Sequence, residues 1–154
     1  MNQSESSPMS SQAHKKLWLS TDGGARGNPG PAGLGLVIKD EAGSVILEHG
    51  QYLGETTNNV AEYSALIAAL KFAHSFGADE LMINMDSELI VKQMKGEYKI
   101  KQPHLQELAG QVEAQLKNFK KYQFNHILRH LNKEADKMVN QAIDEALGVS
   151  RKTI

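Results

Sequence analysis

The chain has 154 residues, of which 40% are hydrophobic and 23% charged, and its formal net charge at pH 7 is -1. This length allows one domain with a sizeable core, and the near-neutral charge excludes a protein that binds nucleic acid through an overall basic surface. The absence of cysteine excludes disulfides, thiolate metal sites and a cysteine nucleophile, so oxygen or histidine ligands must hold any metal.

The two ends of the chain have the composition of tails. Residues 1–13 are rich in serine and lack aromatic side chains, which predicts a disordered segment, and we expect residues 149–154 to be flexible. A single domain over residues 14–148 remains. The polar N-terminus does not resemble a secretory signal, and no apolar stretch reaches the roughly 20 residues that span a membrane. We therefore expect a cytoplasmic protein with no membrane contact.

Three strand-like segments come first in the chain. Alternating and apolar residues predict strands at 16–21, 32–40 and 43–54, the last two separated by turn residues. Short connections of this kind join antiparallel neighbours. We therefore expect an antiparallel meander.

The hydrophobic period changes at residue 59, where apolar residues begin to recur every three or four positions. This pattern predicts a helix that ends near Gly77. Further elements are expected in chain order: a strand at 80–85, helices at 87–94 and 103–118, a strand at 122–130, and a helix from Asn132 to about Gly148. Strands joined through helices favour parallel crossovers. The prediction is an α/β domain whose five-stranded mixed sheet carries helices on both faces.

The segment STDGGARGNPGPAGLG, residues 20–35, follows the first strand. It lacks the spacing of a phosphate-binding loop and leads into a strand instead of a helix, which makes a nucleotide-binding loop a poor interpretation. We expect a long turn that brings backbone close to a ligand, with Asp22 at the end of the strand.

Four acidic residues follow the predicted strand ends or begin predicted helices, and each has a structural explanation. Asp22 can satisfy turn amides, Glu62 can form a capping box with Asn59 as N-cap, Asp86 can cap a helix, and Asp136 suits the dipole of a helix N-terminus.

The joint pattern of these acids is harder to explain by structure alone, because the strand and helix ends concerned can converge in a mixed sheet. Clustered carboxylates repel one another unless cations neutralise them. Oxygen ligands of this kind prefer hard divalent ions such as Mg²⁺.

Four motifs in this order, TDGGARGNPGPAG, TNNVAEYSAL, MDSELIVKQMKGEY and NKEADKMVNQA, resemble those of type 1 ribonucleases H. The resemblance covers nearly all of residues 17–147. It implies the ribonuclease H-like fold, and an endonuclease that hydrolyses the RNA strand of RNA/DNA hybrids and leaves 5′-phosphate and 3′-hydroxyl ends.

By this resemblance, Asp22, Glu62, Asp86 and Asp136 are catalytic and hold two Mg²⁺ ions, for which Mn²⁺ can substitute. Asp22 would bridge both ions. Asp136 would share the ion that activates the attacking water, and Glu62 and Asp86 the ion that stabilises the leaving 3′ oxygen.

The resemblance also implies a surface that reads the 2′-hydroxyls of RNA in the minor groove of the hybrid. The expected substrate-binding residues are Gly23, Gly24, Asn28, Asn58, Asn59, Ser87, Lys92 and Lys95. The asparagines before the helix can equally be helix caps, and the lysines can belong to a solvated face.

His130 lies only six residues before Asp136, without the glycine-containing loop on which some family members carry a catalytic histidine. We include His130 as a catalytic candidate and assign His126 a structural role. The segment GEYKIKQPH is also shorter than the basic handle of some relatives and lacks its tryptophan.

Two other classes of function remain open. The chain can be a nucleic-acid-binding module that kept the fold without the chemistry, or a resolvase or transposase that acts on DNA, because one fold supports many functions. The four acids argue against the first class, and the asparagines against the second. We expect a monomer whose partner is an RNA/DNA hybrid.

Overall fold

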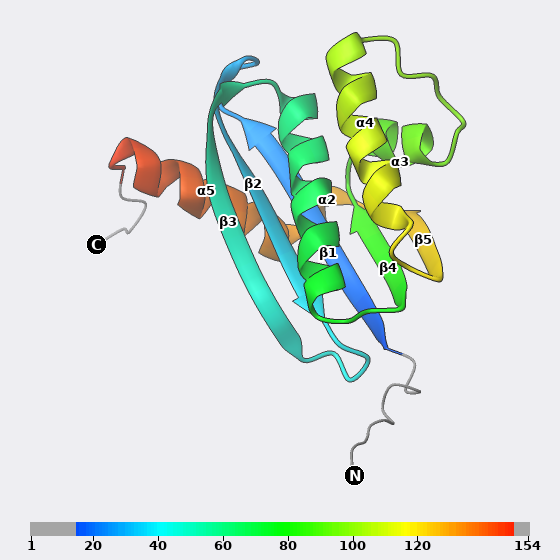
Figure 1. Ribbon diagram of the computed structural model, residues 1–154. Coiled ribbons are helices and arrows are strands. Elements are labelled where there is room, and N and C mark those ends of the chain that lie inside the picture. Colours follow the sequence, from blue (N-terminus) through cyan, green and yellow to red (C-terminus); the bar gives the residue numbers. More distant parts are fainter. Residues whose placement is uncertain (1–14, 150–154) are drawn as a thin grey trace.

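The computed structural model describes residues 15–149 of the chain, and Figure 1 shows its arrangement. Its single sheet has the strands β1 (Lys16–Ala25), β2 (Gly30–Lys39), β3 (Val45–Thr56), β4 (Glu80–Met85) and β5 (Lys121–His126). The helices are α2 (Asn58–Ser75), α3 (Glu88–Met94), α4 (Pro103–Leu116) and α5 (Lys133–Leu147), and a 3₁₀ turn, η1, spans Arg129–Leu131. None of the helices among residues 15–149 is long and apolar enough to cross a membrane.

The sheet is mixed, with the strand order β3-β2-β1-β4-β5. β1, β2 and β3 pair antiparallel, whereas β4 pairs in parallel with both β1 and β5. This confirms the predicted meander followed by parallel crossovers. Together with the helices it is the ribonuclease H-like fold that the sequence indicated.

Helices cover both faces of the sheet, as predicted. α2 packs on β1 and β2 and also contacts α4, while α5 packs on β2, β3 and β1 from the opposite side (Figure 1). The main core lies on the α2 side and includes the fully buried side chains of Leu17 and Leu19 from β1, Ile83 from β4, and Leu66 and Leu70 from α2. The sheet therefore lies between two helical layers, and the four predicted acidic residues lie near one end of its strands.

The prediction that Asp22 ends its strand was wrong. β1 continues three residues beyond Asp22, in register with β2, and the turn is reduced to the residues between Ala25 and Gly30. The parallel pairing with β4, however, stops at Thr21 and Met85. Asp22 and Asp86 are thus the first residues after the last parallel pair of β1 and β4. They lie at the same end of the sheet, although only β4 ends there and β1 continues to Ala25.

Glycines in the segment from 20 to 35 serve close packing as well as the turn. A Cβ at Gly23 would lie 2.3 Å from the backbone of Ala61 in α2, and a Cβ at Gly35 would lie 2.2 Å from the Ala135 carbonyl oxygen in α5. Neither helix could approach the sheet as closely over a larger residue. Much of the glycine-rich segment is strand that packs against α2 and α5, contrary to our expectation of a long turn.

Two further local predictions were wrong. The last strand ends at His126, and Arg129–Leu131 forms η1 where the sequence predicted strand through residue 130. The N-cap of α2 is Thr57, whose side chain accepts a hydrogen bond from the Val60 amide, so the alternative of a capping box from Asn59 to Glu62 is not realised. The predicted tail at 1–13 lies outside the described residues, as does the predicted tail at 149–154 apart from its first residue.

Candidate functional site

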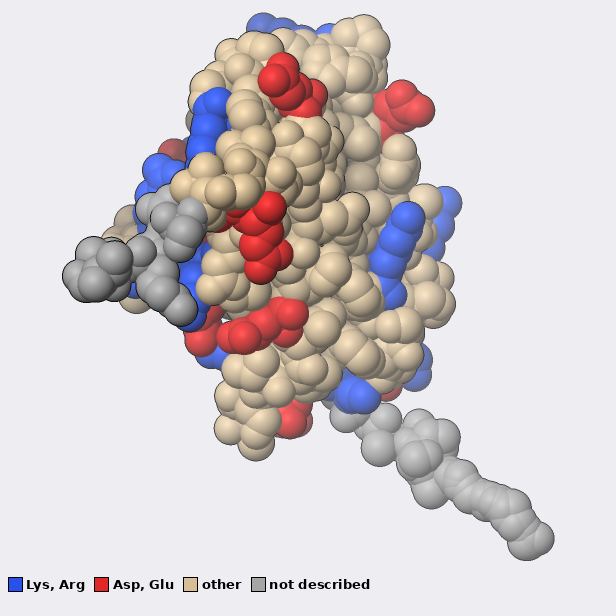
Figure 2. Space-filling view, turned by 90° about the vertical axis from the view of Figure 1, so that its left-hand side faces the viewer, with Lys and Arg blue, Asp and Glu red and all other residues tan. Residues whose placement is uncertain are grey.

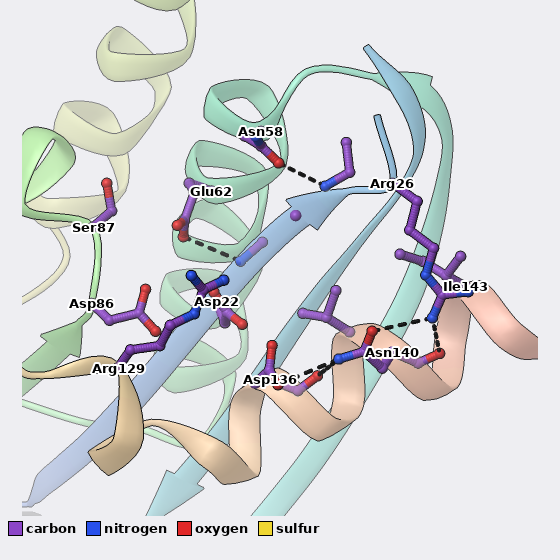
Figure 3. Close-up of a pocket in the computed structure, with 14 residues that line it drawn as sticks. Asp22, Arg26, Asn58, Glu62, Asp86, Ser87, Arg129, Asp136, Asn140 and Ile143 are labelled. Atoms are coloured by element: carbon purple, nitrogen blue, oxygen red, sulfur yellow. Dashed lines mark hydrogen bonds between the residues drawn. The ribbon is translucent and has the colours of Figure 1, made fainter. Parts of the chain in front are cut away.

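A pocket of about 340 Å³ opens where the parallel pairing ends, between the N-terminal part of α2 and the first turns of α5. All four predicted acidic residues line it, together with Gly23, Gly24, Asn58 and Ser87 (Figure 3). Residues separated by more than a hundred positions in the chain therefore meet in one site.

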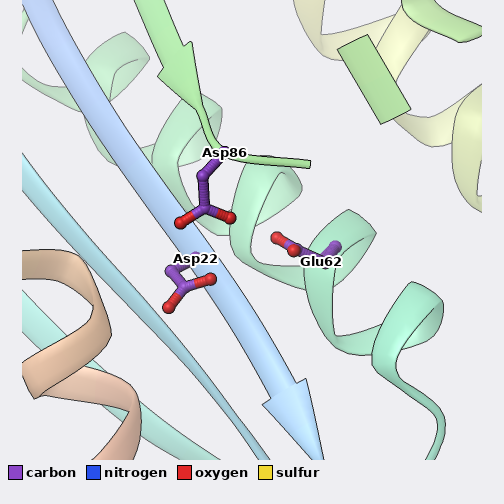
Figure 4. A group of neighbouring side chains, drawn as sticks. All are labelled: Asp22, Glu62 and Asp86. Atoms are coloured by element: carbon purple, nitrogen blue, oxygen red, sulfur yellow. The ribbon is translucent and has the colours of Figure 1, made fainter. Parts of the chain in front are cut away.

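Three carboxylates form the centre of the pocket. Asp22 on β1, Glu62 on α2 and Asp86 after β4 each present an oxygen, and these oxygens lie within 4.8 Å of one another. Figure 4 shows the three side chains pointing toward one another. Asp22 and Glu62 are buried, with 5% and 8% of their surface exposed, and Asp86 is half-buried.

This crowding raises the pKa of the two buried acids. Burial, followed by the charge of Asp86 and contact with Asp136, raises the pKa of Asp22 to about 8. Burial and the charges of Asp22 and Asp86 likewise hold the pKa of Glu62 well above its ordinary value, while the Arg129 guanidinium acts in the opposite direction. The protein alone therefore does not neutralise this cluster of negative charge.

A backbone amide and an asparagine side chain position two of the three carboxylates. The Gly23 amide donates to Glu62 Oε1 at 3.1 Å, which ties α2 to β1. Asn132 Nδ2 donates to the Thr21 carbonyl at 2.9 Å and to Asp86 Oδ2 at 3.1 Å. Asn132 occupies the N-cap position of α5 as predicted, but its side chain holds the site and makes no capping hydrogen bond.

Asp136 lies beside the central group of three, in the first turn of α5 as predicted. Its carboxyl contributes to the raised pKa of Asp22, and Asn140 Nδ2 donates to Asp136 Oδ2 at 3.3 Å. The four acids therefore line one continuous pocket, with Asp136 on the α5 side.

The donor set fits divalent cations. Carboxylate oxygens are the ligands that Mg²⁺ and Mn²⁺ prefer, and three of them lie within the span of a single ion's coordination sphere. The raised pKa values point the same way, because a bound cation would offset both the burial of these carboxyls and the repulsion between them. Asp22, Glu62, Asp86 and Asp136 are the residues that would hold the metal.

Asn58 lines the pocket, and Asn28 is joined to Asn58 by a hydrogen bond. Asn58 Oδ1 accepts from the Ala25 amide at 2.8 Å, and Asn28 Oδ1 accepts from the Asn58 amide at 3.0 Å. The side-chain NH₂ groups of both residues are donors suited to a polar ligand. Ser87 is the N-cap of α3, where its hydroxyl accepts from the Ile90 amide, so the capping role considered for Asp86 belongs to Ser87.

Other predicted substrate residues lie outside this pocket. Asn59 lines a separate hollow with Gln93, Lys99 and Lys101. Lys92 pairs with Glu88 at 3.1 Å and lies 5.0 Å from the centre of the Tyr98 ring, and its hydrogen bonds to Glu88 and Tyr98 raise its pKa. Lys95 is exposed.

His130 lies exposed on η1 and lines a neighbouring hollow with Leu128, Arg129, Lys133 and Asp136. It is not among the residues that line the central pocket. Its neighbour Arg129 does line that pocket, and Figure 3 shows the Arg129 side chain extending toward Asp22. The positive charge of Arg129, a residue that the sequence did not lead us to select, therefore extends toward the acids, whereas His130 lies outside the pocket.

Sequence reasoning also missed Arg26 and Asn140 and the structural contacts of Asn132. A signal existed on α5, because positions 132, 136, 140 and 144 are occupied by Asn, Asp, Asn and Asp. Residues four apart share one face of a helix. A polar line of this kind marks the helix face that turns away from the apolar core, toward a site or toward solvent.

The chain was compared with known proteins. Residues 20–142 match the family model described as reverse transcriptase-like. A bifunctional protein of Mycobacterium tuberculosis is 43% identical over 132 residues, which is 85% of this chain and 36% of that protein. Ribonuclease HI of Halobacterium salinarum is 40% identical over 125 residues, 81% of this chain and 63% of the relative. The chain thus spans less than two thirds of these relatives' length.

Solved structures cover the chain more completely. The crystal structure of RNase H1 from Halobacterium salinarum superposes with a TM-score of 0.82 at 38% identity, over 84% of this chain and 98% of the other. LC11-RNase H1 in complex with an RNA/DNA hybrid gives a TM-score of 0.81 at 50% identity, over 85% and 99%. The mixed sheet and its acidic pocket therefore define a domain of the nuclease class. The chain belongs to the type 1 ribonuclease H family.

Proposed function

We propose that this chain is a metal-dependent endoribonuclease that hydrolyses the RNA strand of RNA/DNA hybrids and leaves 5′-phosphate and 3′-hydroxyl ends. One observation carries the proposal: three carboxylate oxygens within 4.8 Å of one another, two of them on buried residues, in a pocket that also contains Asp136. Such a cluster is costly to fold without cations. A purely structural role would not explain that cost.

In this proposal Asp22, Glu62, Asp86 and Asp136 hold two Mg²⁺ ions, or Mn²⁺ in their place. Bound ions would supply Lewis acidity to the scissile phosphate and lower the pKa of water. The four side chains fix the place where this chemistry occurs, since they are anchored to β1, α2, the end of β4 and α5. Overall, water adds across the bond between phosphorus and the 3′ oxygen, and its proton ends on the 3′-hydroxyl.

Recognition of RNA is assigned to the rim of the pocket. The amide hydrogens of Asn28 and Asn58 can donate to the 2′-hydroxyl, the group that distinguishes RNA from DNA. Gly24 lines the pocket, and a Cβ built there would meet only Asn58 Oδ1 at 4.0 Å, so the backbone lies open to a close ligand. The relative LC11-RNase H1 was solved with an RNA/DNA hybrid, which supports the same substrate class here.

We do not assign substrate binding to the face of the molecule drawn in Figure 2. Figure 2 shows the face that lies on the left-hand side of Figure 1. Acidic side chains run down the middle of this face, and Lys and Arg lie toward its margins. Such a face repels a phosphate backbone. We assign phosphate contacts of the DNA strand to Lys92 and Lys95. A monomer and a cytoplasmic location stay predictions.

The test compares Asp136→Asn with Glu134→Gln, because both residues lie in the first turn of α5 but Glu134 forms an exposed ion pair with Lys39. Wild-type protein should cut the RNA strand of an end-labelled RNA/DNA duplex in Mg²⁺, and EDTA should stop the reaction. Asp136→Asn should lose at least about a hundredfold in rate, and Glu134→Gln should retain full activity.

Duplex RNA, duplex DNA and single-stranded RNA are run beside the hybrid. Binding of the hybrid without cutting, in both Mg²⁺ and Mn²⁺, would replace the proposal with a binding module. Cutting of duplex DNA alone would replace it with a DNA nuclease on the same fold. Analysis of the product ends then tests the assigned polarity of cleavage.

A further inference from the structure

Four polar side chains connect the turn between β1 and β2 to the acidic pocket through α5. Arg26 Nη1 pairs with Asp144 Oδ1 at 2.7 Å, and Arg26 Nη2 donates to Asn140 Oδ1 at 3.1 Å. Asn140 Nδ2 in turn donates to Asp136 Oδ2 at 3.3 Å and to the Asp136 carbonyl at 3.1 Å. Figure 3 shows the contacts from Arg26 through Asn140 to Asp136 along one face of α5.

The two ends of the Asn140 amide face opposite charges. Its oxygen accepts from the Arg26 guanidinium, and its nitrogen donates to the Asp136 carboxylate. The orientation of the amide is therefore dictated, because a reversed amide would place its NH₂ against a cation and its oxygen against an anion. Bonds to charged groups are also the stronger kind.

Arg26 is itself held firmly. Asp144 is buried, with a side chain only 7% exposed, and its pairing with Arg26 brings the guanidinium onto α5. Arg26 also donates to the Asn140 carbonyl at 3.4 Å, so its fork contacts two positions one helical turn apart. A planar, rigid donor group suits this arrangement better than a flexible ammonium group.

We propose that Asn140 is a positioning residue that fixes the Asp136 carboxylate for metal binding, and that Arg26 and Asp144 hold Asn140 in the required orientation. This inference rests on the proposed function for its catalytic consequence. Among the four acids, Asp136 is the one on α5, so its placement depends on this helix. Partners that orient a metal ligand contribute about 10- to 100-fold in metal affinity or activity.

The test measures Mn²⁺ affinity by isothermal titration calorimetry without nucleic acid, and kcat and KM on an RNA/DNA hybrid. The variants are Asn140→Ala, Asn140→Asp and, as control, Gln141→Ala, which changes an exposed neighbour on α5. Asn140→Ala should weaken Mn²⁺ binding and lower kcat, each about tenfold, with KM changed less than twofold. Asn140→Asp keeps the acceptor for Arg26 but turns an oxygen toward Asp136, so it should not restore kcat.

Arg26→Lys provides a second variant that keeps the positive charge beside Asp144. It should shift Mn²⁺ affinity and kcat in the same direction as Asn140→Ala but by a smaller factor, since an ammonium group cannot reproduce the fork. Thermal unfolding of each variant shows whether the protein is folded under the conditions in which its Mn²⁺ affinity and kcat are compared with those of wild type. Asn140→Ala with wild-type kcat and Mn²⁺ affinity would overturn the positioning role, as would a loss in stability alone.

The outcomes separate this inference from the proposed function. If wild-type protein binds Mn²⁺ but does not cut the hybrid, the proposed function fails, and the difference in Mn²⁺ affinity between wild type and Asn140→Ala still decides the positioning role. If wild-type protein cuts the hybrid and Asn140→Ala cuts it equally fast, the function holds and the positioning role fails.

Discussion

The Gly23 amide donates to the Glu62 carboxylate at 3.1 Å, across a contact in which the backbone of β1 touches the backbone of α2. The glycine thus has two functions at once. Its missing Cβ lets the helix approach, and its N–H holds a carboxylate in the pocket. Packing and chemistry depend here on one residue.

We expect Gly23→Ala to unfold or strongly destabilise the protein, because its Cβ would lie 2.3 Å from Ala61 backbone atoms that cannot move aside without shifting α2. The cost should be about 3 kcal/mol or more, typical of severe overpacking. Gly24→Ala is the matched control, since its Cβ meets only Asn58 Oδ1 at 4.0 Å. Urea unfolding of the two variants checks this, and equal stability would contradict the packing role.

Most of the fold was predictable because its signals are local. The helical period after residue 59 and the apolar run at 80–85 each identify an element by itself, and helices between later strands imply parallel crossovers. Where β1 ends was not predictable in this way. Pairing with β2 carries β1 through Gly23 and Gly24, and this long-range ladder overrides the turn preference of glycine.

The site was predictable in its acids and less so in the residues that support them. The positions of the four carboxylates at predicted strand and helix ends indicated that they converge, and the resemblance to a family indicated their joint role. Asn132 and Asn140 act through contacts with residues 111 and 4 positions away. An asparagine at a helix start already has an ordinary explanation as a cap, which conceals any other role until the tertiary structure is known.

Asn132→Ala should destabilise the protein and disturb Asp86. The substitution removes the donor to the buried Thr21 carbonyl and to Asp86 Oδ2, and an unsatisfied buried group costs about 1–3 kcal/mol. Asn118→Ala, which removes an exposed side chain after α4, should change the free energy of unfolding by less than about 0.5 kcal/mol. Chemical denaturation measures both. No difference between the two variants would show that Asn132 has no such role.

His130→Ala should slow turnover several-fold without abolishing it. His130 is exposed and lies beside Asp136 without lining the central pocket, so it can assist proton transfer or product release but cannot hold the reacting group. His126→Ala, at the exposed end of β5, is the control and should leave the rate unchanged. Single-turnover and steady-state rates on the same hybrid distinguish the steps. An unchanged rate in His130→Ala would remove His130 from the catalytic residues.

Asp22→Asn should stabilise the metal-free protein at high pH. The pKa of Asp22 is about 8 in the folded protein and about 3.9 in an unfolded chain, so between these values the folded state binds more protons. Stability of the wild-type protein then falls as pH rises through this window and levels off above it. An asparagine does not titrate. The stability difference should therefore grow from near zero at pH 4 to on the order of 5 kcal/mol above pH 8, in favour of the variant.

Added Mg²⁺ should reverse this order of stability, so that the wild-type protein becomes more stable than Asp22→Asn. Cations that bind only the folded protein stabilise it in proportion to the logarithm of their concentration over the dissociation constant, and binding requires ionised carboxylates. At pH 8 the wild-type melting temperature should rise with added Mg²⁺, while that of Asp22→Asn should change little, because the carboxylate shared by the cluster is gone. Thermal melts of wild type and Asp22→Asn, each in EDTA and in Mg²⁺, test both predictions. If the two proteins respond equally to Mg²⁺, Asp22 does not contribute to the metal site.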